Sequence, residues 1–141
     1  MNLEHSMSIT VQTSIQKPIV HVWNCFTQPE HITQWNQASE DWYCPKAEND
    51  CTVGGKFVYT MAAKDESVSF DFWGIYDAIE EYALISYTLG DERTVRVTFE
   101  DHGDYVVVTE VFDAEQVHSE ELQQAGWQAI LDSFKTHCES H

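Results

Sequence analysis

The chain has 141 residues, 43% of them apolar and 13% aromatic, and carries a formal net charge of -17. This length suffices for one domain with a hydrophobic core, and the composition excludes a chain that is disordered throughout. The negative charge repels nucleic-acid phosphates and anionic lipid headgroups, so neither nucleic acid nor a membrane surface is an expected partner.

The sequence lacks the signals that direct a chain to or across a membrane. No segment approaches the roughly 20 apolar residues of a membrane span, and the N-terminus has no basic region followed by an apolar one. We therefore predict a single cytoplasmic domain over residues 1–141, with residues 1–7 as a disordered extension. In that compartment the four cysteines are expected to be reduced, although Cys44 and Cys51 could approach each other across a loop.

The N-terminal part predicts one strand and two short helices. Apolar and polar residues alternate over residues 9–15, which is typical of a half-buried strand. Pro18 then suits the first turn of a helix whose apolar stripe ends at Phe26. Residues 30–35 predict a second helix, which begins after a further proline.

Residues 36–50 show no clean periodicity and contain Pro45, so we expect a loop there. Trp42 and Tyr43 are unusually large for a solvated loop. The segment is therefore expected to fold over another part of the molecule.

The middle of the chain predicts five strands. Apolar side chains alternate and turn residues interrupt them, which indicates strands at residues 56–63, 69–79, 83–89, 94–100 and 105–112. Strands that follow one another through short turns form an antiparallel sheet, so the fold class is α+β.

The C-terminal residues 119–139 predict one long amphipathic helix. Its apolar positions recur at steps of three and four: Leu122, Gly126, Trp127, Ile130, Phe134 and Cys138. A glycine inside a helix costs roughly 1 kcal/mol relative to alanine, which suggests a packing reason for Gly126. We expect the helix backbone to lie close against the sheet there, so that a leucine at this position would overpack.

Four segments together resemble one known family. They are QPEHITQW (residues 28–35), VGGKF (53–57), FDFWGIY (70–76) and GWQAILDSFK (126–135). With the element order, they resemble bacterial homologues of the activator of heat-shock-protein-90 ATPase, in the START-like (SRPBCC) superfamily. The resemblance implies a START-like or Bet v-like helix-grip fold, in which a curved antiparallel sheet of about six strands holds the long C-terminal helix.

The resemblance has two local departures, both in turns. The family often has Asp-Gly where this chain has Asp65-Glu66, and again where it has Asp91-Glu92. Both departures concern turn geometry and leave the expected fold unchanged.

The resemblance also implies an apolar cavity between the sheet and the long helix. Large side chains that should face this cavity are the candidate ligand-binding residues: Trp35, Trp42, Phe57, Tyr59, Met61, Phe70, Phe72, Tyr76, Tyr87, Phe99, Trp127, Ile130 and Phe134. Buried tyrosine hydroxyls need partners and would orient a polar group of the ligand. The alternative is that these side chains fill a solid core.

No linear catalytic motif or zinc-site spacing occurs, so we predict no catalytic residue, no metal and no cofactor. His21 and His31 are interpreted as surface histidines, and Cys25 and Cys138 as core residues.

Three functional hypotheses remain. The first is a carrier or sensor for a small apolar molecule, and the second is a cavity enzyme such as a cyclase or hydrolase. The third, contact with a chaperone, is weakest because the eukaryotic namesake of the family uses a second domain beside this one. The sequence leaves the ligand and the oligomeric state open.

Overall fold

The computed structural model describes residues 8–141, so the predicted extension at residues 1–7 lies outside the described residues. One antiparallel sheet of seven strands has the order β1-β7-β6-β5-β4-β3-β2. The strands are β1 (Ser8–Ile15), β2 (Trp42–Asn49), β3 (Lys56–Ala63), β4 (Ser69–Glu80), β5 (Leu84–Leu89), β6 (Thr94–Asp101) and β7 (Val106–Asp113), and the helices are α1 (Ile19–Thr27), α2 (Pro29–Trp35) and α3 (Glu120–Ser140).

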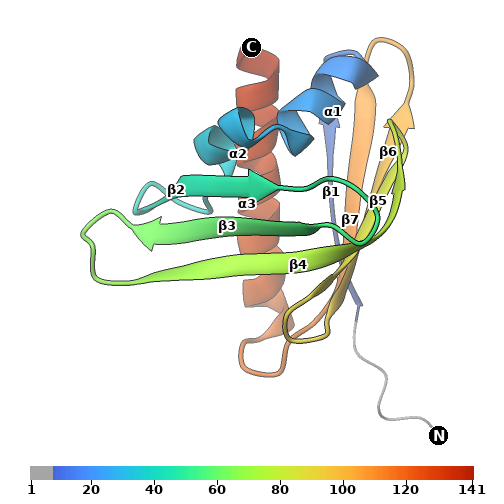
Figure 1. The fold of residues 1–141 in the computed structure, drawn as a ribbon. Coiled ribbons are helices and arrows are strands. Elements are labelled where there is room, and N and C mark those ends of the chain that lie inside the picture. The colour runs from blue at the N-terminus through green and yellow to red at the C-terminus, as the bar shows by residue number, and fades with distance from the viewer. Residues whose placement is uncertain (1–7) are drawn as a thin grey trace, which may run out of the picture.

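The sheet is strongly curved, and α3 lies along its inner side. In Figure 1, β1 and β7 run along α3, whereas β2, β3 and β4 run across it. The short helices α1 and α2 lie beside the C-terminal half of α3, and both contact it. This arrangement is the helix-grip architecture that the sequence predicted.

The predicted loop at residues 36–50 is wrong, because most of it is the edge strand β2. Two features hid the strand. Pro45 lies within it, which an edge strand tolerates because it pairs on one side only. A register shift between Tyr43 and Lys46 also breaks the alternation of apolar and polar residues.

The two turns that depart from the family pattern need unusual backbone conformations. Glu66 and Glu92 have φ values of 66° and 74°, in the left-handed region that favours glycine. The aspartate before each accepts a hydrogen bond from the backbone two residues on, at Ser67 and Arg93. These side-chain contacts help the turns to form without glycine.

Side chains of α3 bind the backbone of the edge strand β1. Gln124 and Gln128 donate to the carbonyl oxygens of Thr10 and Gln12 at 3.2 and 3.1 Å, and Lys135 donates to that of Ser14. The helix therefore covers a sheet edge that would otherwise present unpaired carbonyl groups. Ser119 caps its N-terminus by accepting a hydrogen bond from the Leu122 backbone at 3.1 Å.

A solid aromatic core fills the space between α1, α2 and the C-terminal half of α3. Phe134 packs on Trp35 and Phe26, with ring centroids 4.9 and 5.3 Å apart. Phe99 packs on Trp23 and Phe26 at 5.0 and 5.4 Å. These contacts enclose Phe99 and Phe134 on the side of the short helices.

No helix within residues 8–141 is long and apolar enough to cross a membrane. All four cysteines are free thiols, including Cys44 and Cys51.

Candidate functional site

A cavity of about 630 Å³ lies between the sheet and α3. Ligand pockets in proteins commonly have volumes of about 300–1,000 Å³ and apolar walls with a few polar groups. The walls of this cavity carry residues from α1, α2, the strands β2 to β5 and β7, and α3. Phe70 and Leu122 line it while more than half exposed, so the cavity opens to solvent beside them.

All but two of the predicted ligand-binding residues line this cavity. The predicted residues that line the cavity are Trp35, Trp42, Phe57, Tyr59, Met61, Phe70, Phe72, Tyr76, Tyr87, Trp127 and Ile130. The exceptions are Phe99 and Phe134, which belong to the solid core beneath the short helices. They lie away from the cavity because alternation along a strand or helix identifies the inner face of an element, but not which part of that face other helices cover.

Phe57 is the centre of the aromatic wall formed by the sheet. Its ring centroid lies 4.8 Å from that of Tyr59 and 4.9 Å from that of Tyr87. Phe72 and Tyr76 lie at 5.9 and 5.5 Å. This network fixes the rings that face the cavity, so the wall is rigid and apolar.

Two tryptophans are fixed at different places around the cavity. Trp127 of α3 stacks on Phe112 of β7 with ring centroids 3.9 Å apart. Trp35 donates its indole N–H to the Cys25 carbonyl oxygen at 2.8 Å. The polar atom of Trp35 is therefore satisfied in the core, while the ring contributes apolar surface to the cavity.

The expected close packing of Gly126 against the sheet is wrong. A Cβ atom built at Gly126 would meet no heavy atom of residues 8–141 within 4 Å, and Gly126 lines the cavity. The missing side chain therefore keeps space open where α3 faces the cavity.

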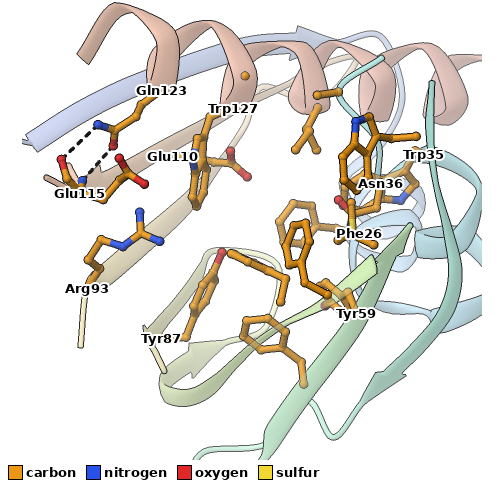
Figure 2. Close-up of a pocket in the computed structure, with 18 of the residues that line it drawn as sticks. Phe26, Trp35, Asn36, Tyr59, Tyr87, Arg93, Glu110, Glu115, Gln123 and Trp127 are labelled. Carbon is orange, nitrogen blue, oxygen red and sulfur yellow. Dashed lines mark hydrogen bonds between the residues drawn. The ribbon is translucent and has the colours of Figure 1, made fainter. Parts of the chain in front are cut away.

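Polar side chains gather at one end of the cavity. In Figure 2, Arg93, Glu115 and Gln123 lie at the end opposite Trp35 and Phe26, and Glu110 lies beside Trp127. Glu110 belongs to β7, where it follows Val106 and Val108 on the buried face of the strand. An ionisable group therefore occupies a core-facing position.

The Glu110 carboxyl group is buried and has no partner among the described residues. Glu110 is only 8% exposed, and no hydrogen bond or ion pair within residues 8–141 reaches its side chain. Every fully enclosed side-chain nitrogen or oxygen in that part of the chain has a partner, so this carboxyl group must touch the open cavity. Burial raises the pKa of Glu110 from 4.5 to about 8, because an apolar setting disfavours the charged form.

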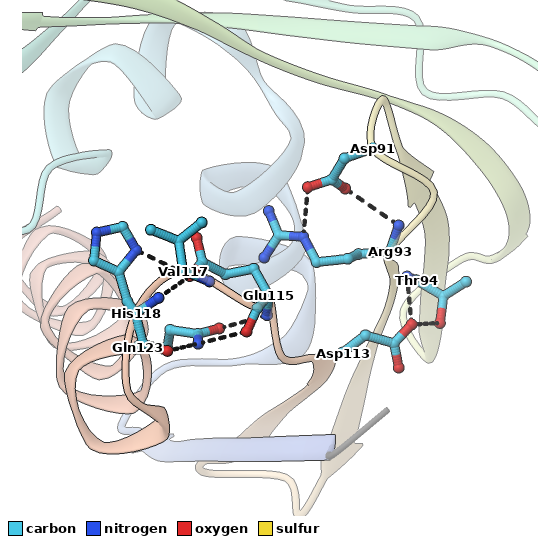
Figure 3. A network of polar contacts seen from close by, with 8 residues as sticks. All are labelled: Asp91, Arg93, Thr94, Asp113, Glu115, Val117, His118 and Gln123. Carbon is cyan, nitrogen blue, oxygen red and sulfur yellow. Dashed lines mark hydrogen bonds and ion pairs between the residues drawn. The ribbon is translucent and has the colours of Figure 1, made fainter. Parts of the chain in front are cut away.

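Arg93 brings the guanidinium group to the same end of the cavity. Its Nε donates to Asp91 Oδ2 at 2.7 Å (Figure 3). Within residues 8–141 the two terminal nitrogens have no hydrogen-bond or ion-pair partner. They remain available to an acceptor in the cavity.

A hydrogen-bonded loop before α3 borders this polar end. The Glu115 carboxylate accepts from the His118 backbone at 2.6 Å and from its ring at 2.9 Å. Gln123 accepts from the Glu115 backbone and donates to the His118 carbonyl oxygen, at 2.9 and 2.8 Å (Figure 3). The backbone hydrogen bond from His118 is the main cause that lowers the pKa of Glu115, which stays ionised.

The three tyrosines predicted to orient a ligand differ in their surroundings. The Tyr76 hydroxyl donates to Asn49 Oδ1, so it has a protein partner. Burial raises the pKa of Tyr59 and Tyr87 well above the usual value, and the Glu110 carboxyl group adds to the increase at Tyr87. The Tyr59 and Tyr87 hydroxyls are therefore neutral at pH 7 and can act as hydrogen-bond donors, whereas the single O–H of Tyr76 is donated to Asn49.

Sequence reasoning missed the polar residues of the site. Glu110 had a visible signal, because it shares the alternating positions of Val106, Val108 and Phe112. Arg93 and His118 had none, since they lie in or beside turns where periodicity carries no information.

Together, the curved sheet, the long helix and the cavity between them define a START-like helix-grip protein. A family model described as "Activator of Hsp90 ATPase homolog 1-like protein" matches residues 16–139. The chain belongs to this family.

Solved structures agree with this assignment. The chain is similar to the AHSA1-like protein from Aeromonas hydrophila, with 41% identity and a TM-score of 0.89 over 95% of this chain and 93% of that one. It is also similar to Chr148 from Cytophaga hutchinsonii, with 49% identity and a TM-score of 0.82 over 94% and 92%. CV1439 from Chromobacterium violaceum shares the fold at 21% identity, with a TM-score of 0.84 over 94% and 98%. No curated protein matches the sequence significantly.

Proposed function

We propose that the protein binds a small, mainly apolar molecule in the cavity between the sheet and α3. The observation that carries the proposal is the combination of a cavity of about 630 Å³ with a fixed aromatic wall and a buried carboxyl group that has no partner within residues 8–141. In a solid core this space would be filled by side chains. A buried carboxyl group in such a core would also have a hydrogen-bond partner. Aromatic walls give large apolar contact areas at low entropic cost.

The two ends of the cavity indicate the kind of ligand. The end near Trp35 and Phe26 is apolar, and the opposite end presents Arg93 and Glu110. Below a pH of about 8 the Glu110 carboxyl group is largely protonated and can donate a hydrogen bond. Both groups then suit an acceptor, so the ligand class is an apolar or aromatic body with one terminal carboxylate or carbonyl group.

Tryptophan fluorescence tests this binding. Trp35, Trp42 and Trp127 line the cavity, so a bound ligand should change their fluorescence. Among fatty acids, flavonoids and polyketide-like aromatic acids, we expect at least one to give a change that saturates. Trp127→Phe should reduce the signal, whereas Trp73→Phe should retain it because Trp73 lies outside the cavity lining. For a carboxylate ligand, Arg93→Gln should weaken binding about tenfold or more, the usual value of a charge-assisted hydrogen bond.

Arg96→Gln is the matched control for the charge, because Arg96 does not line this cavity. Its affinity for the same ligand should equal that of the wild type. Absence of saturation across the panel, together with native mass spectra that show no small molecule on protein from its host, would contradict the proposal.

A cavity enzyme is the second candidate, and Glu110 favours it. A carboxyl group with a pKa near 8 in an apolar cavity has the protonation behaviour of a general acid or base at neutral pH. Consumption of a bound ligand by the wild type, lost in Glu110→Gln while binding persists, would establish this function.

The family description also names a chaperone ATPase, so a chaperone contact is a third candidate. Stimulation of the host Hsp90 ATPase by the protein, unaffected by changes to the cavity, would favour it over ligand binding.

A further inference from the structure

Histidine and cysteine side chains form a second cluster, separate from the cavity, where the three helices meet. Cys25 and His21 belong to α1, His31 to α2, and His137 and Cys138 to α3. None of the five lines the cavity. His21 and His31 were predicted to be surface residues, but both are partly buried in this cluster.

Three of these side chains converge on one point. His31 Nδ1 lies 2.8 Å from His137 Nε2. The Cys25 thiol lies within 4.8 Å of one ring nitrogen of each histidine. One ligand atom comes from each of the three helices. In tetrahedral zinc sites, bonds of about 2.0–2.3 Å place ligand atoms about 3.3–3.8 Å apart, so small side-chain shifts would suffice.

Two more side chains surround the Cys25 thiol. His21 Nε2 lies 3.6 Å from Cys25 Sγ, and the ligand atoms of His21, Cys25 and Cys138 lie within 4.8 Å of one another. Cys25 is therefore shared by two groups of potential metal ligands. A thiol surrounded by imidazole and thiol groups is well placed to act as a metal-binding thiolate.

We propose that Cys25, His31 and His137 bind a soft or borderline divalent cation, with Zn²⁺ as the best match. Thiolate and imidazole ligands prefer such ions to Mg²⁺ or Ca²⁺, which prefer oxygen. The partly exposed His31 gives access from solvent, and a water molecule or Cys138 completes the tetrahedron, because His21 Nε2 donates to the Cys138 carbonyl oxygen at 2.8 Å. The metal would join the end of α3 to α1 and α2.

Imidazole and thiol groups must be deprotonated to bind a metal ion, so metal affinity at this site should fall as the pH is lowered. The linear sequence gave no zinc signal because His31 and His137 are 106 positions apart.

Cobalt titration tests the site directly. Untagged protein is reduced, freed of metal with a chelator and titrated with Co²⁺. The absorption spectrum of bound Co²⁺ shows whether a thiolate is among its ligands and whether its geometry is tetrahedral. We expect one Co²⁺ per chain, with thiolate-to-cobalt charge-transfer and strong visible bands that Zn²⁺ displaces. Cys25→Ser should abolish the charge-transfer band, and His31→Gln should weaken binding by about tenfold or more.

Matched variants separate this site from general metal binding. Cys44→Ser and His102→Gln change a cysteine and a histidine outside the cluster, and both should bind Co²⁺ as the wild type does. At the same concentration, Zn²⁺ should raise the thermal midpoint of the wild type by more than that of folded His31→Gln. A cobalt spectrum without the thiolate band, or full binding by both Cys25→Ser and His31→Gln, would overturn the proposal.

Discussion

Glu110→Gln is expected to raise the free energy of unfolding at pH 9 by up to about 5 kcal/mol and to change it little at pH 5. The pKa of Glu110 increases from 4.5 to about 8 on folding, and each pKa unit corresponds to about 1.36 kcal/mol. Between these two values the folded protein binds a proton that the unfolded chain releases. Stability therefore falls as the pH rises from 4.5 to 8, and glutamine removes this loss.

Urea denaturation of the wild type and the variant at the two pH values measures this difference. The comparison between proteins cancels the titration of all other groups. Glu80→Gln is the control, because Glu80 is exposed at the end of β4, and its effect should be small at both pH values. An equal effect of Glu110→Gln at pH 5 and pH 9 would show that the Glu110 carboxyl group has an ordinary pKa.

A buried carboxyl group that destabilises the fold needs a compensating role. Its position among Val106, Val108 and Phe112 would suit another apolar residue, which would remove the pH-dependent loss of stability. The polar end of the cavity gives such a role, since Glu110 and Arg93 can bind a terminal polar group of the ligand. Ligand binding should then shift the pKa of Glu110.

Periodicity predicted most of the fold. The alternation along β3 to β7 and the long stripe of α3 each identified an element because one face of it is buried. Alternation did not predict β2, because Pro45 and a register shift interrupt the pattern of apolar and polar residues in this edge strand. Local sequence could not reveal β2, because only its pairing with β3 defines it as a strand.

The sequence predicted which side chains face the inside of the sheet, but not which of them border the cavity. Phe99 and Tyr87 occupy inward positions on neighbouring strands, yet Phe99 is covered by Trp23 and Phe26 while Tyr87 faces the cavity. That difference depends on where α1 packs, which no strand pattern encodes. The His31–His137 contact likewise depends on how α2 and α3 meet.

Gly126→Leu is expected to abolish ligand binding while leaving the protein at least as stable. A Cβ atom at Gly126 meets nothing within 4 Å in the part of the chain that the structure describes, so the leucine side chain extends into the cavity without a clash. Replacing glycine inside a helix gains up to about 1 kcal/mol from helix propensity. The ligand, by contrast, would have to share its space with four additional carbon atoms.

Fluorescence titration and urea denaturation of the same samples measure both effects. Ala125→Leu is the matched control, because Ala125 is the adjacent, exposed residue of α3 and should retain wild-type affinity. Gly126→Ala should gain stability and keep most of the binding, since one methyl group takes little of the cavity. If Gly126→Leu bound the ligand as tightly as Ala125→Leu does, the binding site would lie outside the space between the sheet and α3.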